Sequence, residues 1–351
     1  MKYYVKNKYF GNIINKYLES HKHTFENRKI DYYNVDYYNK QYCDTCMITN
    51  QFIDISCLGN KKEQYNNLIK YDPKSINDYV PFTISFTKRN IHQIKKYIKN
   101  NTLWIIKPEN GTFRQGIFII NSYNSLLSNI RRYNINKWIC QKYIENPLLY
   151  DKHKFHFRIY VLVTKTESQI NAYVYHDGFM YLSKFIYNFN NIDDSYLSGE
   201  DSPEQVRLFP RDFIKKFGYH KYKFLIPQIN KIVNSSIGSV KEQILCHNSK
   251  VPNSLCYKLF GYDILIDNKF KVYLGEINGR LITFKYPPPL FKKKLYINIL
   301  DLIFKNNIGS FSKVYTSSHI EYYLNINNNS KVYYYYCIVI VCLIYLLYKY
   351  I

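Results

Sequence analysis

The chain has 351 residues, a length that suggests two or three domains with a substantial buried core. Hydrophobic residues make up 46% of the chain, which excludes wholesale disorder. The 12 glycines beside 40 tyrosines exclude collagen-like, elastic and Gly/Ser-linker architectures.

The chain is strongly basic, with 49 Lys and Arg against 26 Asp and Glu and a net charge of +23. Basic chains attract nucleic acid, anionic membranes or acidic protein segments. Lys, Asn, Ile and Tyr are enriched together, however, as an AT-rich genome would produce. The charge alone therefore does not choose among these partners.

The N-terminal 20 residues are polar and basic and contain no secretory apolar stretch. We therefore expect the eight cysteines to be free thiols. Cys43, Cys46 and Cys57 could begin a zinc site, but a second metal-binding pair is missing, so zinc is not favoured.

The C-terminal end is the most apolar part of the chain. Residues 332–348 carry no charge, and Lys331 and Lys349 flank them. This length is near the minimum for a membrane-spanning helix. We expect a C-terminal tail anchor over residues 332–351, with the rest of the chain cytoplasmic; a buried terminal helix or strand is the alternative.

The elements expected before residue 145 are strands and short helices. Residues 1–78 show weak periodicity and are expected to form a small N-terminal module. After them, periodicity predicts strands over 81–87, 103–107, 117–121 and 138–144, and helices over 88–100 and 122–133.

The second half of the chain alternates strong strands with one long helix. Strands are predicted over 155–163, 171–175, 179–182, 257–266 and 271–277, a long loop over 188–210, and a helix over 221–246. Asp177-Gly178 is a strong hairpin signal. Strands interleaved with helices indicate α/β or α+β layers.

Lys107 ends an apolar strand at a polar hairpin tip that contains Gly111. A lysine ammonium together with loop N–H groups can bind an anion. The chain contains neither a P-loop nor the protein-kinase motifs. A solvated lysine at the end of a strand is the alternative interpretation.

Three potential cations, Lys154, His156 and Arg158, alternate along one strand and therefore share one face of it. Phe155, Phe157 and Ile159 share the other face. Cations in a row repel one another unless an acid or an anion such as a polyphosphate offsets them. A solvent-facing stripe is the alternative.

Asp263 lies within an apolar strand, where an unpaired carboxylate is costly. Glu276 and Asn278 are two residues apart and share a face of the next strand. If the intervening turn centres on Lys269 and Phe270, Asp263 lies opposite Glu276. Two carboxylates and an amide oxygen are ligands suited to Mg²⁺.

Taken in order, these segments resemble the tubulin–tyrosine ligase-like family within the ATP-grasp superfamily. The resemblance covers roughly residues 79–281 and is carried by the segments WIIKP (104–108), QKYIENPLL (141–149), KFHFRIYVLV (154–163), YHDGF (175–179), LFGYDILID (259–267) and YLGEING (273–279).

The resemblance implies an ATP-grasp fold, with two α+β lobes that clamp a nucleotide and a small N-terminal module beside them. The lobes would span residues 79–145 and 146–300, followed by a polar connector over 301–331. The implied cofactors are ATP and Mg²⁺. The implied site residues are Lys107 for the α- and β-phosphates, Gln141, Lys142, Tyr143 and Ile144 for adenine, Lys154 and Arg158 for the phosphate and acyl side, and Asp263, Glu276 and Asn278 for the metal.

The implied activity is an ATP-dependent carboxylate–amine ligase that adds Glu, Gly or Tyr to a protein carboxylate through an acyl phosphate. Arg158, Lys154 and Glu276 would be its catalytic residues. The implied partners are a free amino acid and an acidic protein tail such as that of tubulin, which a basic enzyme would attract. No RNA-binding signature is present, so nucleic acid is not the expected partner.

The sequence departs from the family's pattern in several places, of which two bear directly on the reaction. His156 stands where an acid is usual, and Tyr181 stands where a basic Arg is usual. Both lie on the expected phosphate and substrate side. The alternative function is therefore a catalytically impaired ATP-grasp protein that binds its ligands and is tethered to a membrane.

Overall fold

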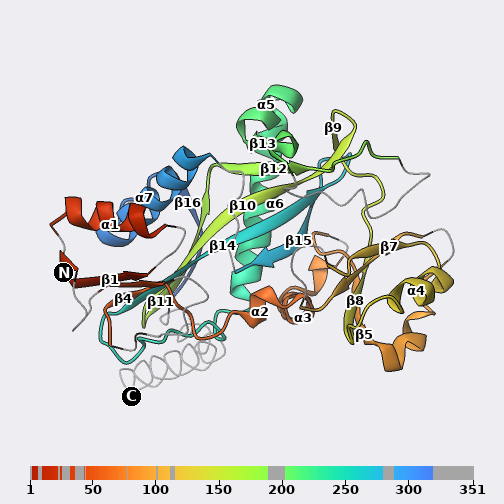
Figure 1. Cartoon of the computed structure of the whole chain (residues 1–351), viewed down its shortest axis with the longest axis horizontal. Coiled ribbons are helices and arrows are strands. Elements are labelled where there is room, and N and C mark those ends of the chain that lie inside the picture. The colour runs from red at the N-terminus through yellow and green to blue at the C-terminus, as the bar shows by residue number, and fades with distance from the viewer. Residues whose placement is uncertain are drawn as a thin grey trace, which may run out of the picture.

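The computed structural model describes residues 2–6, 10–22, 24–25, 32–35, 43, 45–76, 78–99, 102–110, 115–188, 202–279 and 288–318. Helices and strands in these residues build a mixed α+β fold with two sheets, one of twelve strands and one of four. Figure 1 shows the four-stranded sheet to one side of the larger one.

The smaller sheet has the order β5-β8-β6-β7 and confirms four of the predicted strands. Its strands are β5 (Thr83–Thr87), β6 (Trp104–Pro108), β7 (Phe118–Ile120) and β8 (Lys137–Lys142), and α4 (Tyr123–Ile130) packs beside them. The amphipathic helix predicted over 88–100 is wrong. The chain forms a 3₁₀ helix at Lys88–Ile94 instead, and Asn90 leaves the helical region within it.

The larger sheet is built on two long antiparallel strands, β10 (His153–Lys165) and β14 (Leu255–Ile266). Around them pair β9 (Leu149–Tyr150), β11 (Gln169–Tyr175), β12 (Gly178–Leu182), β13 (Val206–Phe209) and β15 (Val272–Asn278). β13 and the 3₁₀ helix Pro203–Gln205 lie where a loop was predicted over 188–210, and residues 189–201 are outside the described residues.

Helices cover both faces of the larger sheet (Figure 1). The helix α6 (Tyr219–Gly238), preceded by α5 (Arg211–Phe217), packs on the face that carries the predicted apolar row of β10. The helices α1 (Gly11–Ser20) and α7 (Pro289–Lys305) pack on the opposite face. The first core includes Phe155, Phe157, Ile159, Ile229 and Ile232, and the second includes Tyr160, Leu162, Ile14, Leu295 and Ile299.

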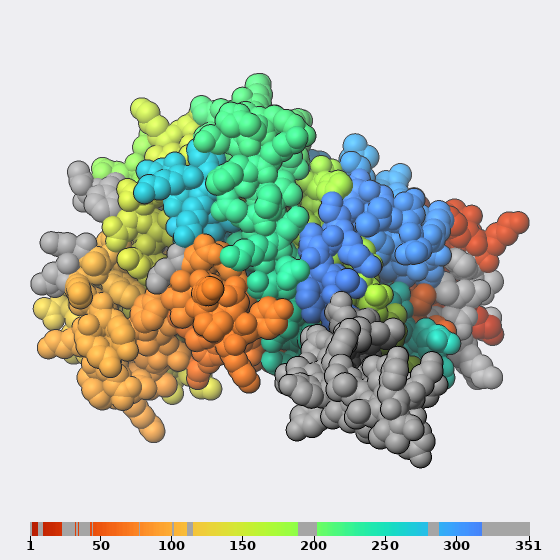
Figure 2. All heavy atoms as spheres, turned by 180° about the vertical axis from the view of Figure 1, so that it is seen from behind, coloured from red at the N-terminus to blue at the C-terminus, as the bar shows by residue number. Residues whose placement is uncertain are grey.

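The first 78 residues extend the larger sheet. The strands β1 (Lys2–Lys6), β2 (Thr24–Phe25), β3 (Tyr32–Val35) and β4 (Ile48–Thr49) pair in parallel, and β4 pairs with the start of β14. Then follow α2 (Ser56–Gly59), α3 (Lys61–Tyr71) and a 3₁₀ helix (Pro73–Ser75). Figure 2 shows this segment in orange beside α6 in green. The domain boundary at residue 78 stays a prediction.

Residues 301–318 are not the polar connector that was predicted there. They contain the end of α7 and the strand β16 (Phe311–Ser318), which pairs with β11 and buries Phe311 and Tyr315. Phe311 packs into the core that α1 and α7 cover and Tyr315 into the core that α6 covers, so both faces of this strand bury an aromatic ring. The predicted anchor over 332–351 lies outside the described residues, and within those described no helix is long and apolar enough to cross a membrane.

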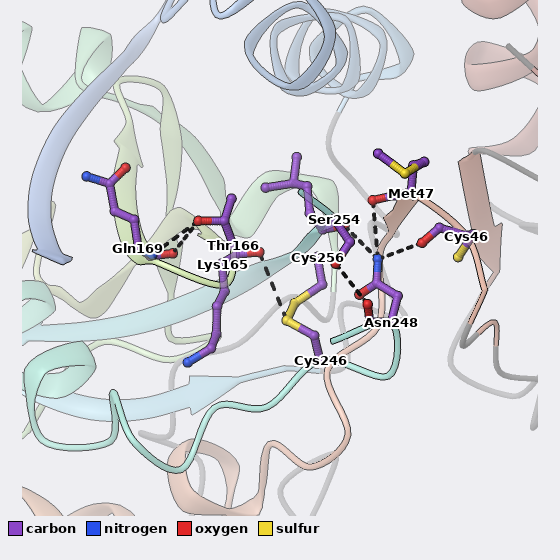
Figure 3. Close-up of a disulfide and its surroundings, with 10 residues drawn as sticks. Cys46, Met47, Lys165, Thr166, Gln169, Cys246, Asn248, Ser254 and Cys256 are labelled. Atoms are coloured by element: carbon purple, nitrogen blue, oxygen red, sulfur yellow. Dashed lines mark hydrogen bonds between the residues drawn. A yellow bond between two sulfur atoms is a disulfide. The ribbon is translucent and has the colours of Figure 1, made fainter. Parts of the chain in front are cut away.

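The expectation of free thiols is wrong for two cysteines. Cys246 and Cys256 form a disulfide with a Cα–Cα distance of 5.9 Å, next to Asn248, which donates hydrogen bonds to the carbonyls of Cys46 and Leu255 (Figure 3). The loop before β14 folds back on the strand and brings the two sulfurs together.

The possible zinc ligands do not converge. Cys57 lies in the main core, whereas Cys43 and Cys46 form a separate small cluster with Tyr4. Over the described ranges, no group of three or more His, Cys, Asp and Glu side chains could hold a metal ion.

A glycine is required where β12 begins. A Cβ atom built on Gly178 would lie 2.5 Å from the carbonyl oxygen of Arg158 on β10, so the two strands would have to separate. Gly178→Ala should therefore lower the free energy of unfolding by about 2 kcal/mol in urea titrations. Gly59→Ala is the matched control, because a Cβ there meets no atom within 4 Å. Equal stability of the two variants would contradict the close approach.

Candidate active site

The strand β10 presents Lys154, His156 and Arg158 on the side away from its buried phenylalanines, as the alternation predicts. Lys154 and His156 are 6% and 8% exposed, so this face is covered and not a solvent-facing stripe. The positive charges on this face therefore need negatively charged or polar partners, either within the protein or in a ligand.

Arg158 and Asp263 form the central ion pair of the site. They lie directly opposite each other on β10 and β14, and Arg158 Nε is 2.6 Å from Asp263 Oδ1 while Nη2 is 3.2 Å from Oδ2. Burial opposes the charged carboxylate, but Arg158 and then His156 outweigh it and hold the pKa of Asp263 below its usual value. The sequence predicted that a carboxylate inside this apolar strand would need a cation, and Arg158 is that cation.

The three predicted metal ligands are neighbours, because Glu276 and Asn278 at the end of β15 lie beside Asp263 within β14. Asp263 pairs across the hairpin with Glu276, as predicted, and Asn278 Nδ2 donates a 3.1 Å hydrogen bond to Asp263 Oδ2. A register shift lies between Asp263 and Ile264. Two carboxylates and one amide supply the kind of oxygen ligand that Mg²⁺ prefers.

The second half of the site lies on the smaller sheet. Lys107 Nζ, at the end of β6, donates a 2.9 Å hydrogen bond to Gln141 Oε1 on β8, and Gln141 in turn donates to Thr83 Oγ1. Lys154 Nζ donates to the hydroxyl of Tyr143 at 2.7 Å and lies 4.0 Å from the centre of its ring. Lys154 therefore links β10 to the residues that follow β8.

Burial disfavours the charged forms of both lysines. It lowers the pKa of Lys107 to about 8, with opposing contributions from Glu276 and Asp263 and a further lowering from Lys61. Burial and the neighbouring Lys107 lower the pKa of Lys154 to about 7. Since Lys107 interacts electrostatically with Glu276, Asp263 and Lys61, the two sheets contribute to one site.

Lys61 belongs to this site and was missed by the sequence reasoning. Its Nζ lies 3.3 Å from Glu276 Oε1, and only 5% of its side chain is exposed. It begins α3, in the segment with the weakest periodicity, so no local pattern indicated a buried charge.

The remaining predicted residues lie at the margin of the site. The side chain of Lys142 is exposed and Ile144 is half-buried. Tyr181 is buried and contacts both Arg158, whose guanidinium carbon lies 5.5 Å from the ring centre, and the ring of His156 at 5.4 Å. The two residues that depart from the family pattern therefore pack together on the Asp263–Arg158 pair.

The arrangement buries more positive than negative charge. Lys61, Lys107 and Arg158 lie near the carboxylates of Asp263 and Glu276, and Lys154 lies near Lys107. An excess of buried cations is costly unless an anion completes it, and ammonium and guanidinium groups are the usual partners of phosphate. The site is therefore suited to a polyanion such as the phosphates of a nucleotide, beside oxygen ligands for a divalent cation.

Comparison with known proteins assigns the chain to one family. The pattern of the "Tubulin-tyrosine ligase family" matches residues 39–198 and 212–280, more than half of the chain. These ranges contain Lys61, Lys107, Lys154, Arg158, Asp263, Glu276 and Asn278.

Individual relatives agree with this match. The chain is 29% identical over 209 residues to "Probable tubulin polyglutamylase ttll-9" of Caenorhabditis elegans, and this alignment covers 54% of the chain and 48% of the relative. It is 26% identical over 277 residues to "Tubulin glycylase 3F" of Tetrahymena thermophila (70% and 30%), and 28% identical over 247 residues to "Probable tubulin polyglutamylase TTLL2" of Homo sapiens (66% and 40%). The matches thus span half or less of each relative.

The lowered lysine pKa values predict a pH dependence of stability. In the unfolded chain Lys154 titrates near 10.5, and in the folded one near 7. Between about pH 7 and 10 the unfolded chain therefore binds more protons, so the contribution of Lys154 becomes more favourable as pH rises. Urea unfolding should show the stability of the wild type rising with pH relative to Lys154→Met over this interval.

Lys184→Met is the control for this prediction, because Lys184 is exposed. Its stability difference from the wild type should stay constant with pH. If the curve of Lys154→Met runs parallel to that of the wild type, Lys154 is charged in the fold at neutral pH as easily as in water, and its burial has no electrostatic cost.

Proposed function

Because the chain belongs to the tubulin–tyrosine ligase family of amino-acid ligases, we propose that it is an ATP-dependent ligase that adds Glu, Gly or Tyr to a protein carboxylate. Membership also implies an ATP-grasp fold, with the two sheets of the structure as the two lobes. The observation that carries the proposal is the cluster of three buried lysines, Lys61, Lys107 and Lys154, beside the Arg158–Asp263 pair and Glu276.

The nucleotide would lie between the sheets. Gln141, Lys142, Tyr143 and Ile144, at and after the end of β8, would line adenine, and Lys107 and Lys154 contact two of these residues. The ammonium groups of the two lysines would then contact the phosphates that extend from the adenosine. A bound polyphosphate would raise the pKa of both lysines, which would then take up protons from solvent and regain the charge that burial disfavours.

Asp263, Glu276 and Asn278 would hold Mg²⁺, since the three residues are neighbours on β14 and β15 and their side chains carry the oxygen ligands that it prefers. When bound, the metal would neutralise charge on the phosphoryl oxygens. Asp263 pairs with Arg158 and Glu276 with Lys61, so neither carboxylate is an unpaired acid.

The ligation would proceed in two steps. An oxygen of the acceptor carboxylate attacks the γ-phosphorus and ADP leaves, which gives an acyl phosphate. The amine nitrogen of the amino acid then attacks the acyl carbon, phosphate leaves, and the nitrogen loses a proton as the amide forms. Lys154 and Arg158 would stabilise the charge that develops on the transferred group, and the fixed strands would align the reacting atoms.

The acceptor would be an acidic protein tail such as that of tubulin. The relatives' names specify tubulin polyglutamylases and a glycylase. A net charge of +23 would draw such a tail to the protein by long-range attraction that weakens with salt.

A second candidate is a protein that binds ATP without ligating. It is favoured by the packing of His156 and Tyr181 against Arg158, which changes the substrate side of the site. Tethering to a membrane by residues 332–351 would belong to this function. Both candidates bind the nucleotide, but only the ligase transfers an amino acid to a protein.

The full chain should transfer labelled Glu, Gly or Tyr to tubulin in the presence of Mg²⁺ and ATP, with ADP formed in equal amount. Glu276→Gln should lower the rate at least about 100-fold, because it removes a charged ligand beside the phosphates. Glu167→Gln, at an exposed turn, should keep the wild-type rate.

The other outcomes separate the candidates. ATP binding without label or ADP would favour the protein that binds and does not ligate. Absence of both ATP binding and labelling would overturn the proposed function altogether.

A further inference from the structure

The helix α6 and the end of α5 are basic without any balancing acid. Residues 213–241 contain six lysines and no Asp or Glu. Exposed helix faces commonly carry acids and bases at neighbouring turns, which offset each other. The first turn of α6 also lacks the acids that the positive end of a helix dipole favours. The beginning of α6 is therefore strongly positive.

The exposed side chains of α6 lie on one side of the helix. In its first half they are Tyr219, His220, Lys223, Phe224 and Pro227. Their spacing follows the helical period, so they form a stripe opposite the leucine and isoleucines that α6 buries against the larger sheet. In Figure 2, α5 and α6, in green, lie at the surface of the face seen from behind.

Two large rings project from this stripe into solvent. Tyr219 is 55% exposed and Phe224 is 57% exposed, although contact with water is unfavourable for surfaces of this size. Between them in sequence lies Lys223, whose Nζ is 5.1 Å from the centre of the Tyr219 ring. Apolar and cationic groups thus alternate at the beginning of α6.

The turn between β14 and β15 extends this surface. The Nζ of Lys221 lies 4.4 Å from the centre of the Phe270 ring, and Gln228 Nε2 donates a 3.1 Å hydrogen bond to the Phe270 carbonyl. These contacts hold the turn against the first half of α6. Lys269, just before Phe270, is exposed, whereas the carboxylate of Asp267 accepts hydrogen bonds from backbone N–H groups of the same turn.

Ion pairs leave this part of the surface positive. Lys216, at the end of α5, pairs with Asp151 at 2.6 Å. Over the described ranges, four other lysines have no carboxylate within ion-pair distance: Lys215, Lys221, Lys223 and Lys269. We call these four lysines, together with Tyr219 and Phe224, the α6 surface.

The combination of lysines and rings selects among anionic partners. A polyacidic protein segment would satisfy the lysines, but it would offer the ring of Phe224 no apolar contact. The surface of a bilayer offers both, because its headgroups carry phosphates and carboxylates, and the acyl chains begin just beneath them. Anionic lipids attract nearby lysines, and aromatic rings favour the boundary between headgroups and acyl chains.

We propose that the α6 surface binds an anionic lipid bilayer. The rings of Tyr219 and Phe224 enter the headgroup region, and the four lysines contact lipid phosphates and carboxylates. This inference does not rest on the proposed ligase activity. It also differs from anchoring through residues 332–351, since insertion of an apolar segment depends on its length and hydrophobicity and not on the charge of the lipids.

The test is co-sedimentation of the full chain with vesicles of phosphatidylcholine alone or mixed with phosphatidylserine, at low and high salt. The wild type should prefer the phosphatidylserine vesicles and bind them less at high salt. Lys223→Gln should weaken this binding about fivefold at low salt, and Phe224→Ser should weaken it about threefold or more at both salt concentrations. The double variant should lose about 10-fold or more.

Lys96→Gln/Tyr97→Ser is the matched control for the double variant. Tyr97 is exposed beside the smaller sheet, and Lys96 Nζ lies 5.0 Å from its ring centre, so a lysine and an exposed ring are neighbours there too. The control should bind vesicles like the wild type. Equal urea midpoints of the two double variants verify that both are folded. An equal loss of binding in both would overturn the inference, because overall composition and not the α6 surface would then govern binding.

Three other results would also overturn it. The first is absence of binding to any vesicle by the wild type. The second is equal binding to both kinds of vesicle, unchanged in Lys223→Gln/Phe224→Ser, which would assign attachment to residues 332–351 alone. The third is weaker binding of Lys223→Gln, but not of Phe224→Ser, to vesicles and to a polyglutamate peptide alike, which would assign the α6 surface to an acidic protein.

Discussion

Burial of like charges is the constraint on which the site depends. Lys61, Lys107, Lys154 and Arg158 come from α3, β6 and β10, and Asp263 and Glu276 come from β14 and β15. No one of these elements could hold its charge alone in an apolar interior. The ion pairs of Arg158 with Asp263 and of Lys61 with Glu276 satisfy part of the demand. A bound polyanion would satisfy the rest, and its binding would then favour the same arrangement that folding does.

Local alternation predicted the strand faces correctly. Phe155, Phe157 and Ile159 enter one core, while Lys154 and Arg158 meet their partners on the other side. The pairing of Asp263 with Glu276 was also right, although for a different reason. Ile266 pairs with Val272, so the turn centres on Lys269, and the register shift beside Asp263 then moves Glu276 opposite it. A bulge of this kind has no reliable sequence signal.

The features that sequence reasoning missed depend on distant contacts. The strands β1–β4 are short and pair in parallel with one another and with β14, far along the chain. In the sequence Lys61 is one of several lysines near the start of a polar helix. Only the three-dimensional structure shows that it is buried against Glu276. Likewise, β16 forms because the edge of β11 accepts it, and Cys246 meets Cys256 only because the loop before β14 folds back.

The central claim is that Lys107 and Lys154 are buried and partly neutral, and that they become fully charged when a polyphosphate binds beside them. Its most direct test is the number of protons taken up when the full chain binds Mg²⁺ and ATP at pH 8, measured by calorimetry in buffers of different ionisation enthalpy. The pKa of Lys107 is about 8 and that of Lys154 about 7 in the free protein, so an adjacent polyanion should raise both and cause net proton uptake. Binding without uptake, or with proton release, would contradict the account.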